Sequence, residues 1–190
     1  MTYSPKDYSN LIGLKGFSDQ LLQNHFKLYQ GYVTNTNKLN ELLLTTDPTT
    51  PMYAELKRRF GWEFNGMRLH ELYFENMSQA SNGMNEALDV TKQIEEDFGS
   101  FENWKKDFSS TAAMRGIGWA ILYYDFSAKR VFNVWINEHD VGHLAGGIPL
   151  VVLDVFEHAY MLDYGINRAD YIKAFFDVLD WNAVDSRFMR

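Results

Sequence analysis

Apolar residues recur at helical spacing in two long stretches near the start of the chain. The first stretch, Ser18 to Leu44, has no proline and a single glycine, and the second runs from Tyr53 to Met77. Between them, Thr45 to Pro51 holds two prolines among Thr and Asp residues, which is typical of a loop. This pattern predicts a helical hairpin. The apolar positions of its first helix are Leu21, Leu22, Phe26, Tyr29, Tyr32 and Val33.

The composition changes after the predicted hairpin. Residues 78–83 are rich in Ser, Asn and Gly, which favours a short linker over a regular element. We therefore expect an N-terminal helical hairpin domain over residues 1–80 and a C-terminal domain over residues 81–190.

The second part switches from helical to strand periodicity and back again. Its helical patterns are Asn85 to Phe98, Phe101 to Met114 with Ser100 placed as its cap, Val155 to Asp163, and Arg168 to Leu179. Its β-rich runs are Trp119 to Tyr124 and Arg130 to Ile136, joined by a hairpin signal, and the buried run Pro149 to Leu153. The predicted fold class is α+β: an N-terminal α-helical hairpin, then a C-terminal α/β domain with a small three-stranded antiparallel sheet and helices.

Composition and charge narrow the classes of function. Hydrophobic residues make up 46% of the 190 residues and charged residues 23%, as in ordinary globular proteins. A net charge of −7 argues against nucleic-acid binding, and the chain has no apolar run long enough for a membrane span. Because its start also lacks the pattern of a secretory signal, we expect a cytoplasmic protein. With no cysteine, a metal site must be built from His, Asp and Glu.

Five histidines are present, and the spacing around His158 is the most informative. Asp154 lies at the predicted end of a strand, and His158 follows four residues later, so the carboxylate and the imidazole can point the same way. Taken alone, this pair is also explained by Asp154 capping a helix and His158 being an interior histidine.

The residues around that pair resemble a known family. The run Pro149 to Tyr160, the run Asp163 to Tyr171 and the pair Asp180-Trp181 are similar to the carboxy-terminal signature of iron/manganese superoxide dismutases. The resemblance continues, in order, along the rest of the chain, in Tyr32 to Asn37, Asn65 to Met77, Gly99 to Phe101 and Gly116 to Ala120.

The resemblance implies that His70, Asp154 and His158 are three of four ligands of one iron or manganese ion. The implied reaction converts superoxide to oxygen and hydrogen peroxide by alternate reduction and oxidation of that ion. Neutral imidazoles with one carboxylate suit both metals. For the fourth ligand, the family's spacing from the gateway tyrosine points to Asn24, but we favour the adjacent His25 because imidazole is the better ligand. The other possibility is that neither residue binds.

The resemblance also implies an outer pair of catalytic residues. Tyr32 matches the gateway tyrosine, and Gly66 leaves room where iron-type members carry glutamine, so we expect His139 to supply the hydrogen-bonding group. Two other interpretations of His139 remain: a surface histidine beside Asp140, or, if the segment is helical, an i, i+4 metal pair with His143.

Two features bear on assembly and on activity. Glu157 and His158 match the family's dimer contact, so we expect a homodimer or a dimer of dimers. At the positions of the family's cross-subunit His–Tyr pair this chain has Tyr29 and Met161, so that relay is expected to be absent. Two further hypotheses therefore stand beside the enzyme: a superoxide-dismutase-like homologue that binds metal with weak or no activity, and a structural homologue without metal. Arg168 is a candidate for attracting the anionic substrate.

Overall fold

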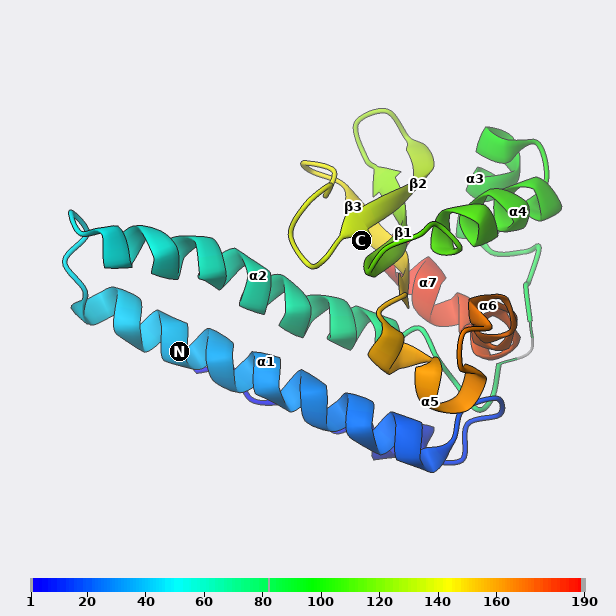
Figure 1. Ribbon diagram of the computed structural model, residues 1–190. Helices are drawn as coiled ribbons and strands as arrows, with labels where there is room; N and C mark the ends of the chain where they lie inside the picture. The colour runs from blue at the N-terminus through cyan, green and yellow to red at the C-terminus, as the bar shows by residue number, and fades with distance from the viewer. Residues whose placement is uncertain (1, 82, 189–190) are drawn as a thin grey trace.

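A computed structural model describes residues 2–81 and 83–188, so residue 82 of the predicted linker lies outside the described part. Two long helices dominate the first half of the chain, α1 (Asp19–Thr45) and α2 (Pro51–Phe74). Their starts are capped as expected for the local sequence, because Ser18 accepts a hydrogen bond from the Leu21 N–H and Thr50 from the Tyr53 N–H. Figure 1 shows them side by side as a hairpin that extends away from the sheet. The predicted hairpin is confirmed.

The second half holds the predicted three-stranded antiparallel sheet, and its strand order is β2-β1-β3. Its strands are β1 (Gly118–Asp125), β2 (Arg130–Asn137) and β3 (Ile148–Asp154). The central strand β1 is buried along nearly its whole length. Around the sheet lie α3 (Asp89–Phe98), α4 (Phe101–Ala112), α5 (Met161–Tyr164), α6 (Arg168–Val178) and α7 (Trp181–Phe188). The 3₁₀ turns are η1 (Ser9–Leu11) and η2 (Glu157–Ala159).

Two predicted helices are shorter in the structure because side chains bind nearby backbone groups. The helix expected from Asn85 begins at Asp89, since the Asn85 side chain accepts the Ala87 N–H and forms a local turn. The continuous helix expected over Val155 to Asp163 is replaced by η2 and α5. There the Asp154 carboxylate accepts the Phe156 N–H at 2.8 Å, and Phe156 has extended backbone angles.

The end of α2 is fastened to the edge of the sheet by one buried amide. Asn76 donates from Nδ2 to the Leu150 carbonyl at 3.2 Å and accepts the Val152 N–H at 2.8 Å. A buried amide that satisfies two strand groups cannot slide without losing both bonds. The hairpin is thereby held in a fixed position against β3. The division into two domains at residue 80 stays a prediction.

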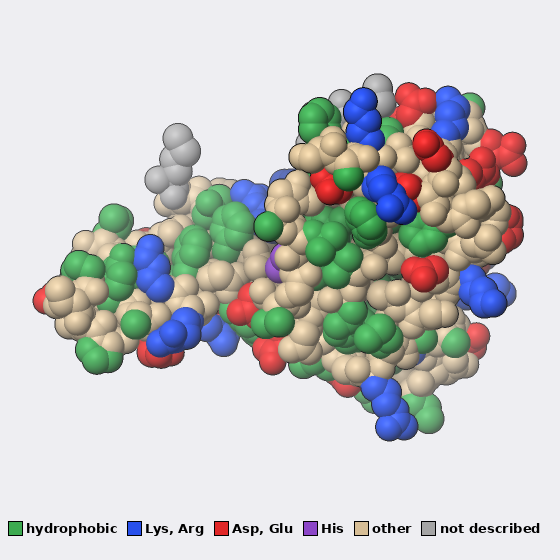
Figure 2. Space-filling model, turned by 90° about the horizontal axis from the view of Figure 1, so that it is seen from above, with side chains coloured by type: hydrophobic (Ala, Val, Ile, Leu, Met, Phe, Trp, Pro, Cys, Tyr) green, Lys and Arg blue, Asp and Glu red, His purple; other side chains and the backbone are tan. Residues whose placement is uncertain are grey.

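The molecule has the form of a narrow arm joined to a bulkier body (Figure 2). A histidine side chain is visible at the surface where the arm meets the body, and acidic side chains gather at the far end of the body. Among the described residues, none of the helices combines the length and apolarity that crossing a bilayer requires.

Candidate metal centre

The four residues expected to bind a metal come together in the structure from four different elements. His25 lies on α1, His70 on α2, Asp154 at the last position of β3 and His158 in η2. Their Nε2 atoms lie 3.2, 3.6 and 3.1 Å from Asp154 Oδ2 for His25, His70 and His158. One ligand atom from each of the four residues lies within 4.8 Å of the other three. Three imidazoles therefore converge on one carboxylate oxygen.

The position of Asp154 is fixed by its backbone and by its second oxygen. Asp154 pairs with Trp119 across the sheet, and its carbonyl accepts a 2.7 Å hydrogen bond from the buried Tyr171 hydroxyl. Oδ1 accepts a hydrogen bond from the Phe156 N–H, so Oδ2 is the oxygen that faces the histidines. The convergence of Asp154 and His158 thus depends on a tight turn and not on one face of an α-helix.

His70 gives the most direct indication of a bound cation. Its Nδ1 lies 2.6 Å from the Gly66 carbonyl, which can only accept, so Nδ1 carries the proton and Nε2 presents a bare lone pair. This Nε2 is buried and has no hydrogen-bond partner among the described residues. A buried acceptor without a partner is costly, and a second nitrogen fixed by a backbone carbonyl is the usual arrangement of a metal-binding histidine.

The distances from Asp154 to the three histidines are also suitable for a shared ion. Two ligands about 2.1 Å from a common ion and separated by 90–120° lie roughly 3.0–3.6 Å apart. The separations of 3.1–3.6 Å around Asp154 Oδ2 fall in this range. Nitrogen and carboxylate donors of this kind suit iron and manganese, so the residues present fit either metal.

On α1 the structure separates the two candidates for the fourth position. His25 is 1% exposed and points into the cluster, whereas Asn24 is exposed and its side chain accepts a hydrogen bond from Gln20. The helix is α-helical throughout, so adjacent residues face directions about 100° apart. Only His25 shares the site with His70.

Burial favours the neutral form of two of these imidazoles, those of His25 and His70. It lowers the pKa of His25 and lowers that of His70 well below the usual value. Burial would raise the pKa of Asp154, but the charge of His158 and hydrogen bonds from His158 and His25 outweigh it and hold that pKa below its ordinary value. Deprotonated groups are what a metal ion requires as ligands.

Tyr32 and His139 form a buried pair beside the cluster. The Tyr32 hydroxyl lies 2.8 Å from His139 Nε2, and Trp119 donates from Nε1 to His139 Nδ1 at 3.0 Å. Because an indole N–H can only donate, neutral His139 must carry its proton on Nε2 and donate it to the Tyr32 oxygen. Burial lowers the pKa of His139 to about 4, which keeps the ring neutral.

The interpretation of His139 as a surface residue is wrong, because the side chain is fully buried. The segment containing His139 and His143 is not helical, so the i, i+4 metal pair is wrong as well. The sequence predicted that the missing side chain at Gly66 leaves space for another group. In the structure, a Cβ at position 66 would lie 2.6 Å from the Tyr32 ring. The ring of Tyr32 therefore fills the space that a side chain at position 66 would occupy.

Sequence reasoning missed Trp62. Its ring centroid lies 4.5 Å from that of His139 and 5.6 Å from that of Tyr32, and its Nε1 donates to Glu138 at 2.9 Å. The available signal was the spacing of Trp62, Gly66 and His70 at i, i+4 and i+8, which places them on one face of α2.

Tyr29 and Arg168 have structural partners. Tyr29 is 1% exposed and donates from its hydroxyl to Glu71 at 2.9 Å, so it faces the hairpin interior and not a neighbouring subunit. Arg168 donates to the carbonyls of Met114 and Gly116 and to the Tyr160 hydroxyl, which ties down the segment before β1. Its guanidinium is occupied in these contacts.

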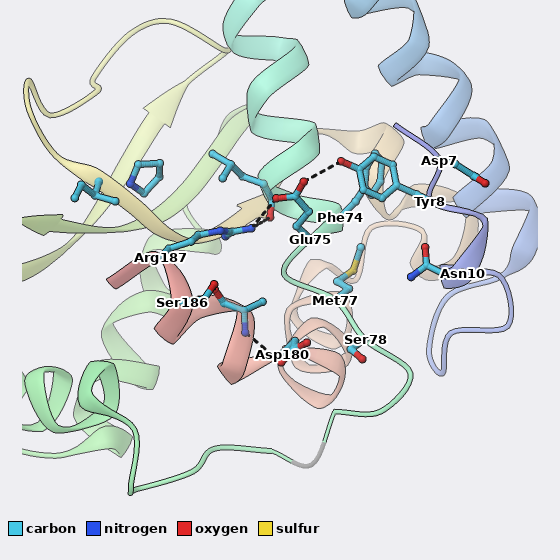
Figure 3. A pocket seen from close by; sticks show the side chains of 14 residues that line it. Asp7, Tyr8, Asn10, Phe74, Glu75, Met77, Ser78, Asp180, Ser186 and Arg187 are labelled. Carbon is cyan, nitrogen blue, oxygen red and sulfur yellow. Dashed lines mark hydrogen bonds and ion pairs between the residues drawn. The ribbon is translucent and has the colours of Figure 1, made fainter. Parts of the chain in front are cut away.

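A cleft of about 610 Å³ lies between the N-terminal segment, the end of α2 and α7 (Figure 3). Phe74 lines it, and the ring of Phe74 packs 5.0 Å from that of His25 and so separates the cleft from the cluster. Two of its charged residues form ion pairs: Glu75 accepts from Lys6 at 2.6 Å and lies 3.5 Å from Arg187. We assign the chemistry to the cluster and not to this cleft.

Fold and site together define a protein with a buried three-histidine, one-aspartate metal centre between a helical hairpin and a small sheet. Residues 85–187 match the profile described as iron/manganese superoxide dismutases, C-terminal domain. The chain is 39% identical to a manganese superoxide dismutase of Haloarcula marismortui over 94% of this chain and 87% of that protein. It is 37% identical to an iron superoxide dismutase of Aquifex pyrophilus over 97% of this chain and 90% of that protein. The chain belongs to the iron/manganese superoxide dismutase family.

Proposed function

We propose that this chain is a superoxide dismutase that uses one iron or manganese ion held by His25, His70, Asp154 and His158. The observation that carries the proposal is the convergence of three imidazoles on Asp154 Oδ2, where the Nε2 lone pair of His70 has no hydrogen-bond partner among the described residues. A bound iron or manganese ion would accept an electron from one superoxide and give an electron to a second. The products are oxygen and, after uptake of two protons, hydrogen peroxide.

The protein's own residues would supply an oriented proton donor beside the metal. His139 donates from Nε2 to the Tyr32 oxygen, so the hydroxyl proton of Tyr32 is directed elsewhere and can be donated toward the substrate. Burial raises the pKa of Tyr32, so the phenol keeps this proton at neutral pH. Trp62 and Trp119 pack around the pair and exclude water from it.

Removing the metal should abolish activity, and restoring it should return activity. Metal-loaded protein is expected to suppress the reduction of cytochrome c by a superoxide source, whereas protein stripped by a chelator at acid pH should not. Reloading with iron or manganese in separate samples identifies which ion supports turnover. Full activity in a sample shown by elemental analysis to be metal-free would refute the proposal.

A second candidate is a homologue that binds metal but turns over slowly. It is favoured by Tyr29, which bonds to Glu71 within the chain at the position where the family resemblance implies a cross-subunit contact. The same samples separate the two functions, because the slow homologue would show near-stoichiometric metal with very low dismutase activity.

The surface around His158 supports a homodimer or a dimer of dimers. Glu157 is exposed, the side chain of His158 is 29% exposed, and three apolar side chains nearby are left open to solvent. These are Met161, Leu162 and Ile166, at 45%, 58% and 95% exposure. The cytoplasmic location expected from the sequence stays a prediction.

Substitution of Glu157 tests this assembly. Glu157→Ala should weaken the dimer by at least tenfold in dissociation constant if each Glu157 bonds across the interface, since a bond to the imidazole of His158 is lost on both sides. Sedimentation of the metal-loaded protein over a concentration series measures this constant. Glu96→Ala, which changes an exposed glutamate of α3, is the comparison, and an unchanged dimer in both variants would contradict the placement.

A further inference from the structure

The loop that carries His139 is held at both ends. At its start, Glu138 has a left-handed backbone with φ of 50°, and its carboxylate accepts the Trp62 N–H. Asn137 and Val141 exchange backbone hydrogen bonds of 2.8 and 3.3 Å across the bend. These contacts fix the backbone around the bend, but none of them is made by His139 itself.

His143 provides the direct contact. Its Nε2 lies 2.8 Å from the His139 carbonyl, which can only accept, so this nitrogen carries the proton. Nδ1 is then an acceptor and lies 2.6 Å from the Tyr123 hydroxyl of β1. A chain of two hydrogen bonds therefore runs from the sheet, through the His143 ring, to the backbone of His139.

Tyr123, which donates the first of these two hydrogen bonds, is held firmly in place. Tyr123 is 3% exposed, and burial raises its pKa to about 12, so the hydroxyl keeps its proton. Gly147 packs on the ring, because a Cβ there would lie 2.9 Å from it. Both nitrogens of His139 are already used by Trp119 and Tyr32, so the nearby His143 does not pair with it as a second metal site.

We propose that Tyr123 and His143 are positioning residues for His139, and that their hydrogen bonds keep its ring between Trp119 and Tyr32. The catalytic consequence rests on the proposed function, but the placement of His139 can be tested without it. Small displacements matter here, since the proton donor must stay within hydrogen-bond reach of its partner.

The test compares two adjacent tyrosines of β1. Tyr123→Phe removes the hydroxyl that bonds to His143, while Tyr124→Phe removes one that makes no hydrogen bond within the described part of the chain. Protein loaded with gallium(III), a diamagnetic ion, allows the indole N–H protons to be followed by nuclear magnetic resonance. Trp119 reports on His139, and Trp104, which donates to Asn133 at 3.0 Å, reports on the rest of the domain.

In Tyr123→Phe we expect the Trp119 indole resonance to shift while that of Trp104 stays in place, and neither should move in Tyr124→Phe. In the iron- or manganese-loaded form, kcat/KM should fall roughly fivefold, the effect of one neutral hydrogen bond. His143→Phe should do the same, and the double variant should be no worse than His143→Phe alone.

An unmoved Trp119 resonance in Tyr123→Phe and His143→Phe would overturn the proposal, as would an equal shift of Trp104, which indicates a general disturbance. If the wild-type protein has no dismutase activity, the proposed function fails, but the resonance comparison still decides the positioning.

Discussion

Protein with His25→Ala is expected to lose its metal and its dismutase activity, whereas Asn24→Ala should retain both. His25 is buried with its Nε2 3.2 Å from Asp154 Oδ2, so its removal deletes a ligand that no neighbouring side chain can replace. Loss of an outer-shell partner alone commonly weakens metal binding about 10- to 100-fold, and loss of a ligand should exceed this.

The measurement is elemental analysis after dialysis, followed by the cytochrome c assay. Asn24→Ala is a matched control from the adjacent position: Asn24 is exposed, and alanine favours the helix, so this variant should fold at least as well as wild type. The metal content and activity of His158→Ala show the level expected when one ligand is lost. Full metal content in His25→Ala would show that α1 contributes no ligand.

The metal-free protein is expected to lose stability steeply as the pH falls from about 6.5 to 5. In the unfolded chain a histidine takes up a proton near pH 6.5, but in the folded protein burial lowers the pKa of His25, His70 and His139. A group with a lowered folded-state pKa stabilises the fold above its unfolded pKa, and this stability is lost as the pH falls toward the folded value. Three such groups lower the free energy of unfolding by roughly 3–4 kcal/mol for each pH unit of acidification.

Urea unfolding of the metal-free protein at several pH values measures this slope. His139→Gln should reduce it by about one third, because one of the three titrating groups is removed while the buried position keeps a hydrogen-bonding side chain. A slope in the wild type no larger than that of a single proton would mean that the folded protein accommodates charged imidazoles. A further loss is expected below about pH 4, where the unfolded Asp154 carboxyl is protonated and the folded one is not.

Local patterns were sufficient to predict most of the helices and strands. The hairpin helices are long and strongly periodic, and their caps Ser18 and Thr50 are local features of the sequence. The segment after Asp154 was predicted incorrectly because a carboxylate that bonds to the backbone two residues later competes with helix formation. Such competition depends on which way one side chain turns, and periodicity does not record it.

By itself the sequence predicted the α+β class and the order of the main elements, and its resemblance to the superoxide dismutases gave His70, Asp154 and His158 as candidate ligands, because ordered motifs are local properties of the chain. Only the tertiary structure placed His25, and not Asn24, beside Asp154 and ruled out the alternative interpretation of His139 as a surface residue. The reason is physical: both choices depend on which face of α1 meets α2 and on how the loop after β2 closes over Trp119. Contacts between residues more than a hundred positions apart, such as His25 with Asp154, form only when the hairpin packs on the sheet.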